Sequence, residues 1–148
     1  MAESASTIDR QLINAMRKGD ATCVSTLRML KSAVKNAEIE ARHALSKQEF
    51  QKVVAREVKK RKEAAVQYAH AGDATREGQE LKESDILSVF LPEQMSEKEV
   101  RAIVKGVVAK TGASSPKEMG KVMGPVMAKV AGKADGSLVK KIVLDVLK

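Results

Sequence analysis

The chain has 148 residues, enough for one domain or two small ones, and its 27 Lys and Arg against 19 Asp and Glu give a formal net charge of +8. It has one tyrosine, two phenylalanines and no tryptophan, so its core must be aliphatic. No apolar run approaches the ~20 residues that span a bilayer, the N-terminal residues lack the pattern of a secretory signal, and the single cysteine excludes an internal disulfide. We therefore expect no membrane contact and a cytoplasmic location.

Two helices are predicted in the first forty residues. Ser6 and Asp9 have the spacing of a capping box and open the first helix, which Gly19 ends. Asp20 is a natural N-cap for the second helix, which is expected from about Ala21 to Ala41. The apolar residues of both helices recur every three or four positions, as expected for a buried stripe. They are Ile8, Leu12, Ala15, Met16, Cys23, Leu27, Leu30, Val34, Ala37 and Ala41.

A basic helix and an acidic helix are predicted next. Ser46 and Glu49 form a capping box that opens the third helix. Its basic cluster at 59–62 is interpreted as a solvated face, with phosphate contact as the alternative. Residues 73–91 carry the opposite charge, so a fourth helix there can pack beside the third and cancel its field, and Pro92 closes it. The residues expected in the core are Phe50, Val54, Val58, Ala65, Tyr68, Leu81, Ile86, Leu87, Phe90 and Leu91.

Three more helices are predicted in the last third of the chain. The fifth begins with a capping box at 96–99 and ends at Gly112. The sixth has Ser115 as its N-cap, and a break or kink is expected at Gly124-Pro125 because proline lacks a backbone donor. Asp135 caps the last helix.

The apolar period is three or four everywhere, and no alternating strand pattern occurs. We therefore predict an all-α, multihelical fold with a four-helix N-terminal domain at 1–92 and a three-helix C-terminal domain at 93–148. The positive charge is concentrated in the second part, since residues 95–148 hold 11 Lys and Arg against 5 Asp and Glu. A basic lobe of this kind favours a polyanionic partner, and solubility is the alternative explanation.

Residues able to carry chemistry are few and scattered. Cys23 lies on an apolar stripe without a flanking histidine or basic residue, so we interpret it as a core residue and not a nucleophile. His43 and His70 have no matching carboxylate or cysteine pattern, and no Gly-rich phosphate loop precedes a lysine. We expect no catalytic residue, no metal and no cofactor.

Five segments of the chain resemble the YqeY-like proteins, and together they cover nearly its whole length. The segments are TLRML at 26–30, EVKKRKEAAVQY at 57–68, FLPEQMSEKEV at 90–100, KEMGKVMGPVMAKVAGKADGSLV at 117–139 and IVLDVL at 142–147. The C-terminal part of that family is similar to the tail of the B subunit of glutamine-dependent aminoacyl-tRNA amidotransferases (GatB). The resemblance implies two helical domains.

The resemblance implies docking and not chemistry. The chain resembles one subunit of a carbon–nitrogen ligase that uses glutamine as amido-N-donor. The catalytic part of that subunit is missing from this chain, and the tail of that subunit helps to dock tRNA. We expect a non-catalytic accessory protein that binds tRNA or another structured RNA, with an amidotransferase or an aminoacyl-tRNA synthetase as the kind of protein partner implied. The matching positions are Lys121, Lys129, Lys133, Lys140 and Lys141, with Gly120, Gly132 and Gly136 allowing close backbone approach.

Helix N-termini near Ser115, at the expected kink and near Asp135 would offer free N–H groups to phosphates. With almost no aromatic residues, recognition of RNA shape is expected in place of base stacking. Plain surface remains the alternative for the lysines. Two other functions stay open: a protein-interaction adaptor that uses the Met-rich face of residues 119–130, and an enzyme with converging titratable groups. For the methionines, the alternative to a docking surface is the core.

Overall fold

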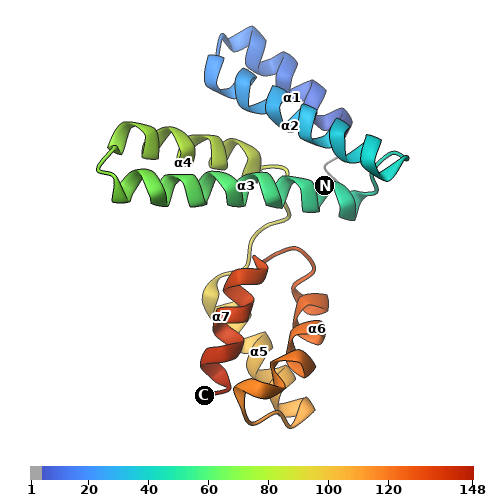
Figure 1. Cartoon of the computed structure of the whole chain (residues 1–148). Coiled ribbons are helices and arrows are strands. Elements are labelled where there is room, and N and C mark those ends of the chain that lie inside the picture. The colour runs from blue at the N-terminus through green and yellow to red at the C-terminus, as the bar shows by residue number, and fades with distance from the viewer. Residues whose placement is uncertain (1–4) are drawn as a thin grey trace. The chain divides into compact units, whose positions relative to one another are not determined.

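The computed structural model describes the backbone of residues 5–148 and the side chains from Ser6 onward. Every regular element in this range is a helix, which confirms the all-α prediction (Figure 1). The chain divides into two compact units, an N-terminal unit that ends at Leu91 and a C-terminal unit of residues Pro92–Lys148. The helices are α1 (Ala5–Lys18), α2 (Ala21–Ala41), α3 (Lys47–His70), α4 (Ala74–Ser88), α5 (Glu97–Thr111), the 3₁₀ turn η1 (Pro116–Glu118), α6 (Met119–Val130) and α7 (Gly136–Val146).

The N-terminal unit consists of two helical hairpins, α1–α2 and α3–α4 (Figure 1). Phe50 and Phe90 meet edge to face in its core, with ring centroids 6.3 Å apart. Met16 and Leu81 were expected in the core, yet both are exposed, so the stripes of α1 and α4 are narrower than predicted. The buried core residues are Ile8, Ala15, Leu27, Leu30, Val34, Phe50, Val53, Val54, Val58, Leu87 and Phe90.

Local capping sets most helix boundaries in this unit. The Asp20 carboxylate accepts a hydrogen bond from the Cys23 backbone N–H. Ser46 and Glu49 form the predicted capping box, in which the Glu49 carboxylate accepts from the Ser46 N–H at 2.7 Å. The predicted cap at Ser6 is wrong, because α1 already includes the residue before it.

Arg61 corrects the prediction that the basic cluster of α3 is wholly solvated. Its side chain is buried, and its guanidinium donates to a carboxylate oxygen of Glu57 at 3.0 Å and to the Glu57 carbonyl at 3.1 Å. The Arg61 Nε atom also lies 3.8 Å from a carboxylate oxygen of Glu83 on α4. Arg61 continues the buried stripe of Val58 and Ala65, so its position follows from helical spacing although its residue type does not.

Replacement of Arg61 should destabilise the N-terminal unit strongly. Arg61→Met leaves the largely buried Glu83 carboxylate without its cation and leaves Glu57 with only the exposed Lys60, so we expect the free energy of unfolding to fall by about 2–4 kcal/mol in urea denaturation. Arg56→Met, at an exposed position of α3, is the matched control and should stay within about 0.5 kcal/mol of the unaltered protein. Equal effects of the two substitutions would contradict a structural role for the buried guanidinium.

The C-terminal unit has an aliphatic core of three packed helices. The segment before α5 is tied to the loop between α6 and α7, because the Met95 N–H donates to the Lys133 carbonyl at 2.7 Å and the Gln94 amide donates to the Gly132 carbonyl at 3.3 Å. The predicted capping box at Ser96 and the helix end at Gly112 are both present. The buried residues are Val100, Val104, Val107, Ala113, Val122, Val126, Val130, Ala134, Val139, Ile142, Val143 and Leu147.

The predicted break at Gly124-Pro125 is wrong. After the single 3₁₀ turn η1, α6 runs as one helix with Pro125 inside it. Proline removes its own backbone donor, and its ring crowds the carbonyl of the residue four positions earlier. Val122, Val126 and Val130 are fully buried along one side of α6, and we attribute the continuity of the helix to their packing against α5 and α7.

Two consecutive left-handed residues follow α6. Ala131 has φ 45° and Gly132 has φ 80°. A residue with a side chain is strained in this backbone conformation, and glycine removes the strain. Glycine also has a larger conformational entropy in the unfolded chain, which opposes the gain. We expect Ala131→Gly to raise the free energy of unfolding by a net amount of about 0.5–1 kcal/mol. Ala102→Gly, at an exposed helical position of α5, should lower it by a similar amount, about 0.5–1 kcal/mol. Urea denaturation of both variants measures the two signs, and a loss of stability with Ala131→Gly would contradict the strain.

Candidate nucleic-acid interface

The five candidate lysines lie on α6, on α7 and on the loop between them. All five are exposed, which any RNA contact requires. Successive residues of an α-helix point about 100° apart, so Lys140 and Lys141 face different directions from α7. The structure therefore spreads the lysines over α6, α7 and the loop between them, and does not gather them into one pocket. They are Lys121 and Lys129 on α6, Lys133 in the loop, and Lys140 and Lys141 on α7.

Four of these lysines form no ion pair in the described part of the chain, although the charge of Lys141 acts on Asp145 after the larger effect of Arg101. Lys121 lies 3.6 Å from a carboxylate oxygen of Glu118, and this ion pair reduces its contribution. Among the residues described, the lysines that form no ion pair are Lys129, Lys133, Lys140 and Lys141. The field of the C-terminal unit is therefore positive over the α6–α7 surface.

The candidate glycines have three different environments. Gly120 is exposed, and no atom would touch a Cβ added to it, so the backbone there is open to a ligand. Gly132 adopts a left-handed conformation, and its carbonyl already accepts a hydrogen bond from Gln94. Gly136 is partly buried, and the methyl group of Met127 lies 3.8 Å from the position of an added Cβ. Gly120 is open, Gly132 is exposed but partly engaged by Gln94, and Gly136 is partly covered by Met127, so the three glycines differ in how closely a ligand could approach.

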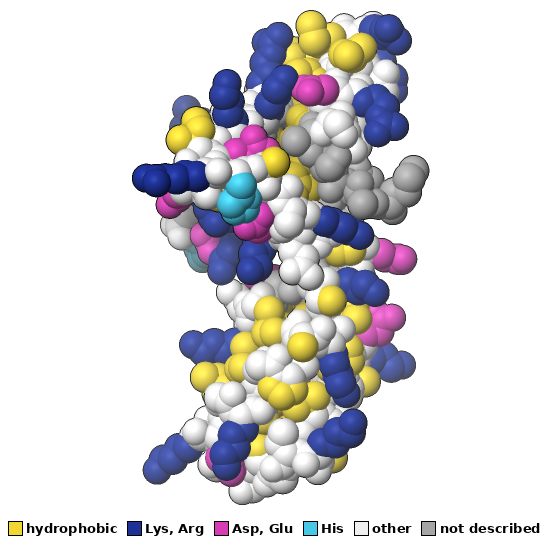
Figure 2. All heavy atoms as spheres, turned by 90° about the vertical axis from the view of Figure 1, so that its right-hand side faces the viewer, with side chains coloured by type: hydrophobic (Ala, Val, Ile, Leu, Met, Phe, Trp, Pro, Cys, Tyr) yellow, Lys and Arg dark blue, Asp and Glu magenta, His cyan; other side chains and the backbone are white. Residues whose placement is uncertain are grey.

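One face of the C-terminal unit has an apolar area (Figure 2). Figure 2 shows this area on the C-terminal unit, with Lys and Arg side chains around its edge. Met119 and Met123 pack partly buried against the core, whereas Met127 is 37 % exposed. The methionines of α6 thus divide between core and surface.

The helix ends offer less to an anion than the sequence indicated. At the start of η1, the Glu118 carboxylate accepts from the N–H groups of Ser114 at 2.7 Å and Ser115 at 3.1 Å, so these donors are already used. The end expected at Pro125 does not exist, because α6 is continuous. The start of α7 remains, with Asp135 as its N-cap and no cap hydrogen bond from that side chain. Lysines, and not helix ends, provide most of the positive potential.

Sequence analysis missed an ion-pair group between α5 and α7. Arg101 donates to the Asp145 carboxylate at 2.9 Å and lies 3.6 Å from Glu97. The hydrogen bond from Arg101, and then its charge, lowers the pKa of Asp145. An open groove of about 360 Å³ runs beside this group and is also lined by Lys141 and Lys148. The paired residues are 44 positions apart, so no local pattern could have revealed them.

The titratable groups of the N-terminal unit are not gathered into a site. Burial raises the pKa of the Cys23 thiol, and the nearby charge of Asp20 raises it further, which disfavours the thiolate. The exposed His43 ring lies 2.8 Å from the Ala44 carbonyl oxygen and 3.6 Å from Glu49. Within residues 5–148, no three His, Cys, Asp or Glu residues are grouped in a way that could hold a metal ion.

None of the described helices combines the length and apolar character needed to cross a membrane.

The fold and surface define an all-helical protein whose C-terminal unit is basic. The family model described as Yqey-like protein matches residues 5–147, so the chain belongs to the Yqey-like protein family, and the resemblance of the five segments is confirmed. A search of the curated proteins finds no match.

Glu118 should make the stability of the C-terminal unit depend on pH. The N–H groups of Ser114 and Ser115 favour its ionised form and lower its pKa from the ordinary 4.5. This stabilisation is fully present above the ordinary pKa and is lost as pH falls through the lower pKa of the folded protein. Glu118→Gln should therefore lower the melting temperature at pH 7, and the deficit should shrink as the solution is acidified below that folded pKa.

Glu93→Gln is the control for this measurement, because Glu93 is exposed and makes none of these hydrogen bonds. Its melting temperature should follow that of the unaltered protein at every pH. A deficit for Glu118→Gln that grows towards low pH would contradict the role assigned to the carboxylate.

Proposed function

We propose that this protein is a non-catalytic accessory protein that binds tRNA or another structured RNA through its C-terminal unit. The observation that carries the proposal is the set of four exposed lysines without ion pairs on α6, α7 and their loop. Lysines that replace the counterions of a phosphate backbone gain free energy from counterion release. The N-terminal unit, with its nearly balanced charge, would contribute much less to this binding.

The kind of RNA follows from what the C-terminal unit lacks. All the aromatic residues of the chain, Phe50, Tyr68 and Phe90, belong to the N-terminal unit. Without rings in the basic unit, unpaired bases have no stacking partner there. Contact with the phosphates and 2′-hydroxyls of a folded RNA needs only cations and an accessible backbone, such as that of Gly120.

The resemblance of residues 117–139 to the tail of the amidotransferase B subunit supports tRNA over other RNAs. The chain lacks the catalytic part of that subunit, so we propose that it acts beside an amidotransferase or an aminoacyl-tRNA synthetase and performs no amide transfer itself. Family membership is compatible with this role and specifies no ligand.

Charge reversal tests the interface. The triple variant Lys129→Glu, Lys133→Glu and Lys141→Glu should bind folded tRNA more than tenfold more weakly, because each phosphate contact that is lost also leaves a repulsive charge. The slope of log affinity against log salt concentration should fall by about one for each contact removed. Fluorescence anisotropy with labelled tRNA at several salt concentrations measures both quantities.

The matched control reverses three exposed lysines of the N-terminal unit, Lys35, Lys47 and Lys52. This variant has the same net charge as the first, yet we expect it to retain most of the affinity. Equal losses in the two triple variants would show binding by net charge alone and would contradict a localised interface.

One observation favours the adaptor as a second candidate function. Met127 is partly exposed on α6, and methionine suits adaptable protein contacts. In this case a partner should co-purify after nuclease treatment and be lost with Met127→Glu, while binding to tRNA stays unchanged. RNA released from the bait by nuclease would support the first function instead.

A further inference from the structure

The Arg61 guanidinium has only a weak hydrogen-bond partner on α2. Its Nη1 atom donates to the carbonyl oxygen and to a carboxylate oxygen of Glu57, on its own helix, at 3.1 Å and 3.0 Å. Its Nη2 atom instead donates to the thioether sulfur of Met29, which belongs to α2 and lies 3.8 Å away. A thioether is a weak acceptor, whereas a charged donor forms its stronger bonds with oxygen. This contact therefore joins α2 to α3 less firmly than an oxygen acceptor would.

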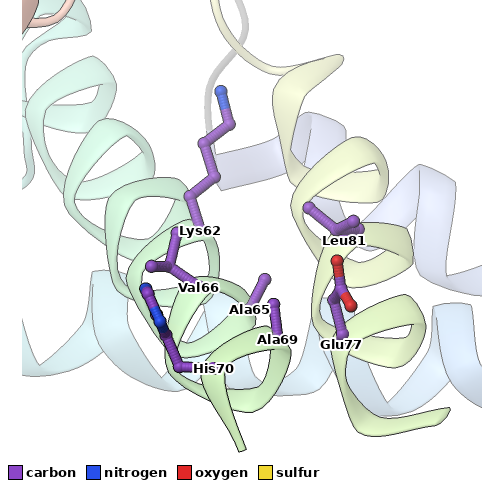
Figure 3. A pocket seen from close by; sticks show the side chains of 7 residues that line it. All are labelled: Lys62, Ala65, Val66, Ala69, His70, Glu77 and Leu81. Atoms are coloured by element: carbon purple, nitrogen blue, oxygen red, sulfur yellow. The ribbon is translucent and has the colours of Figure 1, made fainter. Parts of the chain in front are cut away.

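The surroundings of Arg61 offer little to replace this weak acceptor. Arg61 is 4 % exposed, and its Nε atom is buried and finds no hydrogen-bond partner among the described residues. An open groove between α3 and α4 is lined by the adjacent Lys62 and not by Arg61 (Figure 3). Successive residues of a helix point about 100° apart, so the two side chains leave α3 in different directions. One more oxygen acceptor would therefore satisfy a buried cation that has donors to spare.

The side chain of Met29 is open to solvent. It is 53 % exposed, so an oxidant in solution can reach its sulfur. Oxidation to the sulfoxide adds an oxygen and makes the side chain polar. Methionine has three rotatable side-chain bonds, so either epimer of the sulfoxide can turn its oxygen towards the guanidinium. Because the position is exposed, the new polar group does not have to be buried without a partner.

We propose that Met29 is a redox-modification site whose sulfoxide strengthens the contact between α2 and α3 through Arg61. With hydrogen peroxide as the oxidant, a sulfur lone pair attacks one peroxide oxygen, so that an S–O bond forms and the O–O bond breaks. The departing hydroxide takes the proton of the oxygen bound to sulfur and leaves as water. The sulfur is oxidised by two electrons, which the peroxide gains. The Nη2 atom of Arg61 then donates to the sulfoxide oxygen.

Met16 is the matched control for this proposal. It lies on α1 and is 54 % exposed, so an oxidant in solution reaches it as readily as Met29. In the described part of the chain, Met29 is the methionine whose sulfur accepts a hydrogen bond. A sulfoxide at Met16 therefore gains no bond of this kind. Comparison of the two positions separates the effect of Arg61 from the effect of exposure.

Oxidation of two single variants of the full chain tests the proposal. Met16→Leu retains Met29, and Met29→Leu retains Met16. Each variant is treated with hydrogen peroxide, and peptide mass spectrometry locates the added oxygen atoms. Unfolding in urea is followed by the fluorescence of Tyr68, the single tyrosine, which lies on α3 and so reports on the N-terminal unit.

The two variants should respond differently. Oxidation should raise the folding equilibrium constant of Met16→Leu about fivefold, because one charge-assisted hydrogen bond is gained. Methionine sulfoxide reductases should reverse this gain. The oxidised Met29→Leu protein should gain nothing. No gain in Met16→Leu, equal gains in the two variants, or a Met29 that stays reduced while Met16 is oxidised would each overturn the proposal.

Glutamine tests the hydrogen bond without an oxidant. Met29→Gln replaces the sulfur by an amide whose oxygen is a strong acceptor. We expect its folding equilibrium constant to exceed that of the unaltered protein about fivefold. Met16→Gln makes the same change at an equally exposed helical position and should give no gain. A similar result at both positions would overturn the role of Arg61, since only Met29 contacts its guanidinium among the described methionines.

Discussion

The guanidinium of Arg61 joins the two helices on which the N-terminal unit depends. It pairs with Glu83 on α4 and with Glu57 of its own helix, on a stripe of α3 that is otherwise aliphatic. The arrangement has a cost, because the Arg61 Nε atom and the hydroxyls of Thr26 and Ser84 are buried and find no hydrogen-bond partner among the described residues. A cation on α3 matched to a carboxylate on α4, Glu83, specifies how the two helices pair more sharply than a purely apolar contact would.

The hydrophobic cores of the two units are built from different residues. The N-terminal unit uses two phenylalanine rings and a buried ion pair, while valine dominates the core of the C-terminal unit. Short aliphatic side chains allow the three helices of the C-terminal unit to pack closely, and its lysines remain on the surface. The exposed lysines of α6, α7 and their loop therefore add charge to the surface and take no part in the core.

Local chemistry explains which parts of the fold were predictable. The capping boxes at Ser46 and Ser96 depend on residues three positions apart, so the sequence contains the whole interaction. The prediction at Pro125 was wrong because it considered the lost backbone donor alone. It did not consider the buried valines of α6 that continue on both sides of the proline. The charge of Arg61 led to the prediction of an exposed side chain. Its helical spacing from Val58 and Ala65 indicates a buried one.

The candidate interface was less predictable than the fold. Exposure of the lysines followed from their type, but the use of Ser114 and Ser115 by Glu118 depends on the conformation of a turn. The Arg101–Asp145 pair joins distant segments, so only the packed helices bring it together. Contact between RNA and Lys129, Lys133, Lys140 or Lys141 stays a prediction.

The uneven placement of rings makes the two units optically distinct. Tyr68, the single tyrosine, lies in α3 with the Arg76 guanidinium 5.8 Å from its ring centroid, and the chain has no tryptophan. Near-ultraviolet absorption and intrinsic fluorescence therefore report only on the first ninety or so residues. Melting of the valine-rich helices changes neither signal directly, so a spectroscopist following tyrosine alone would see half of the molecule.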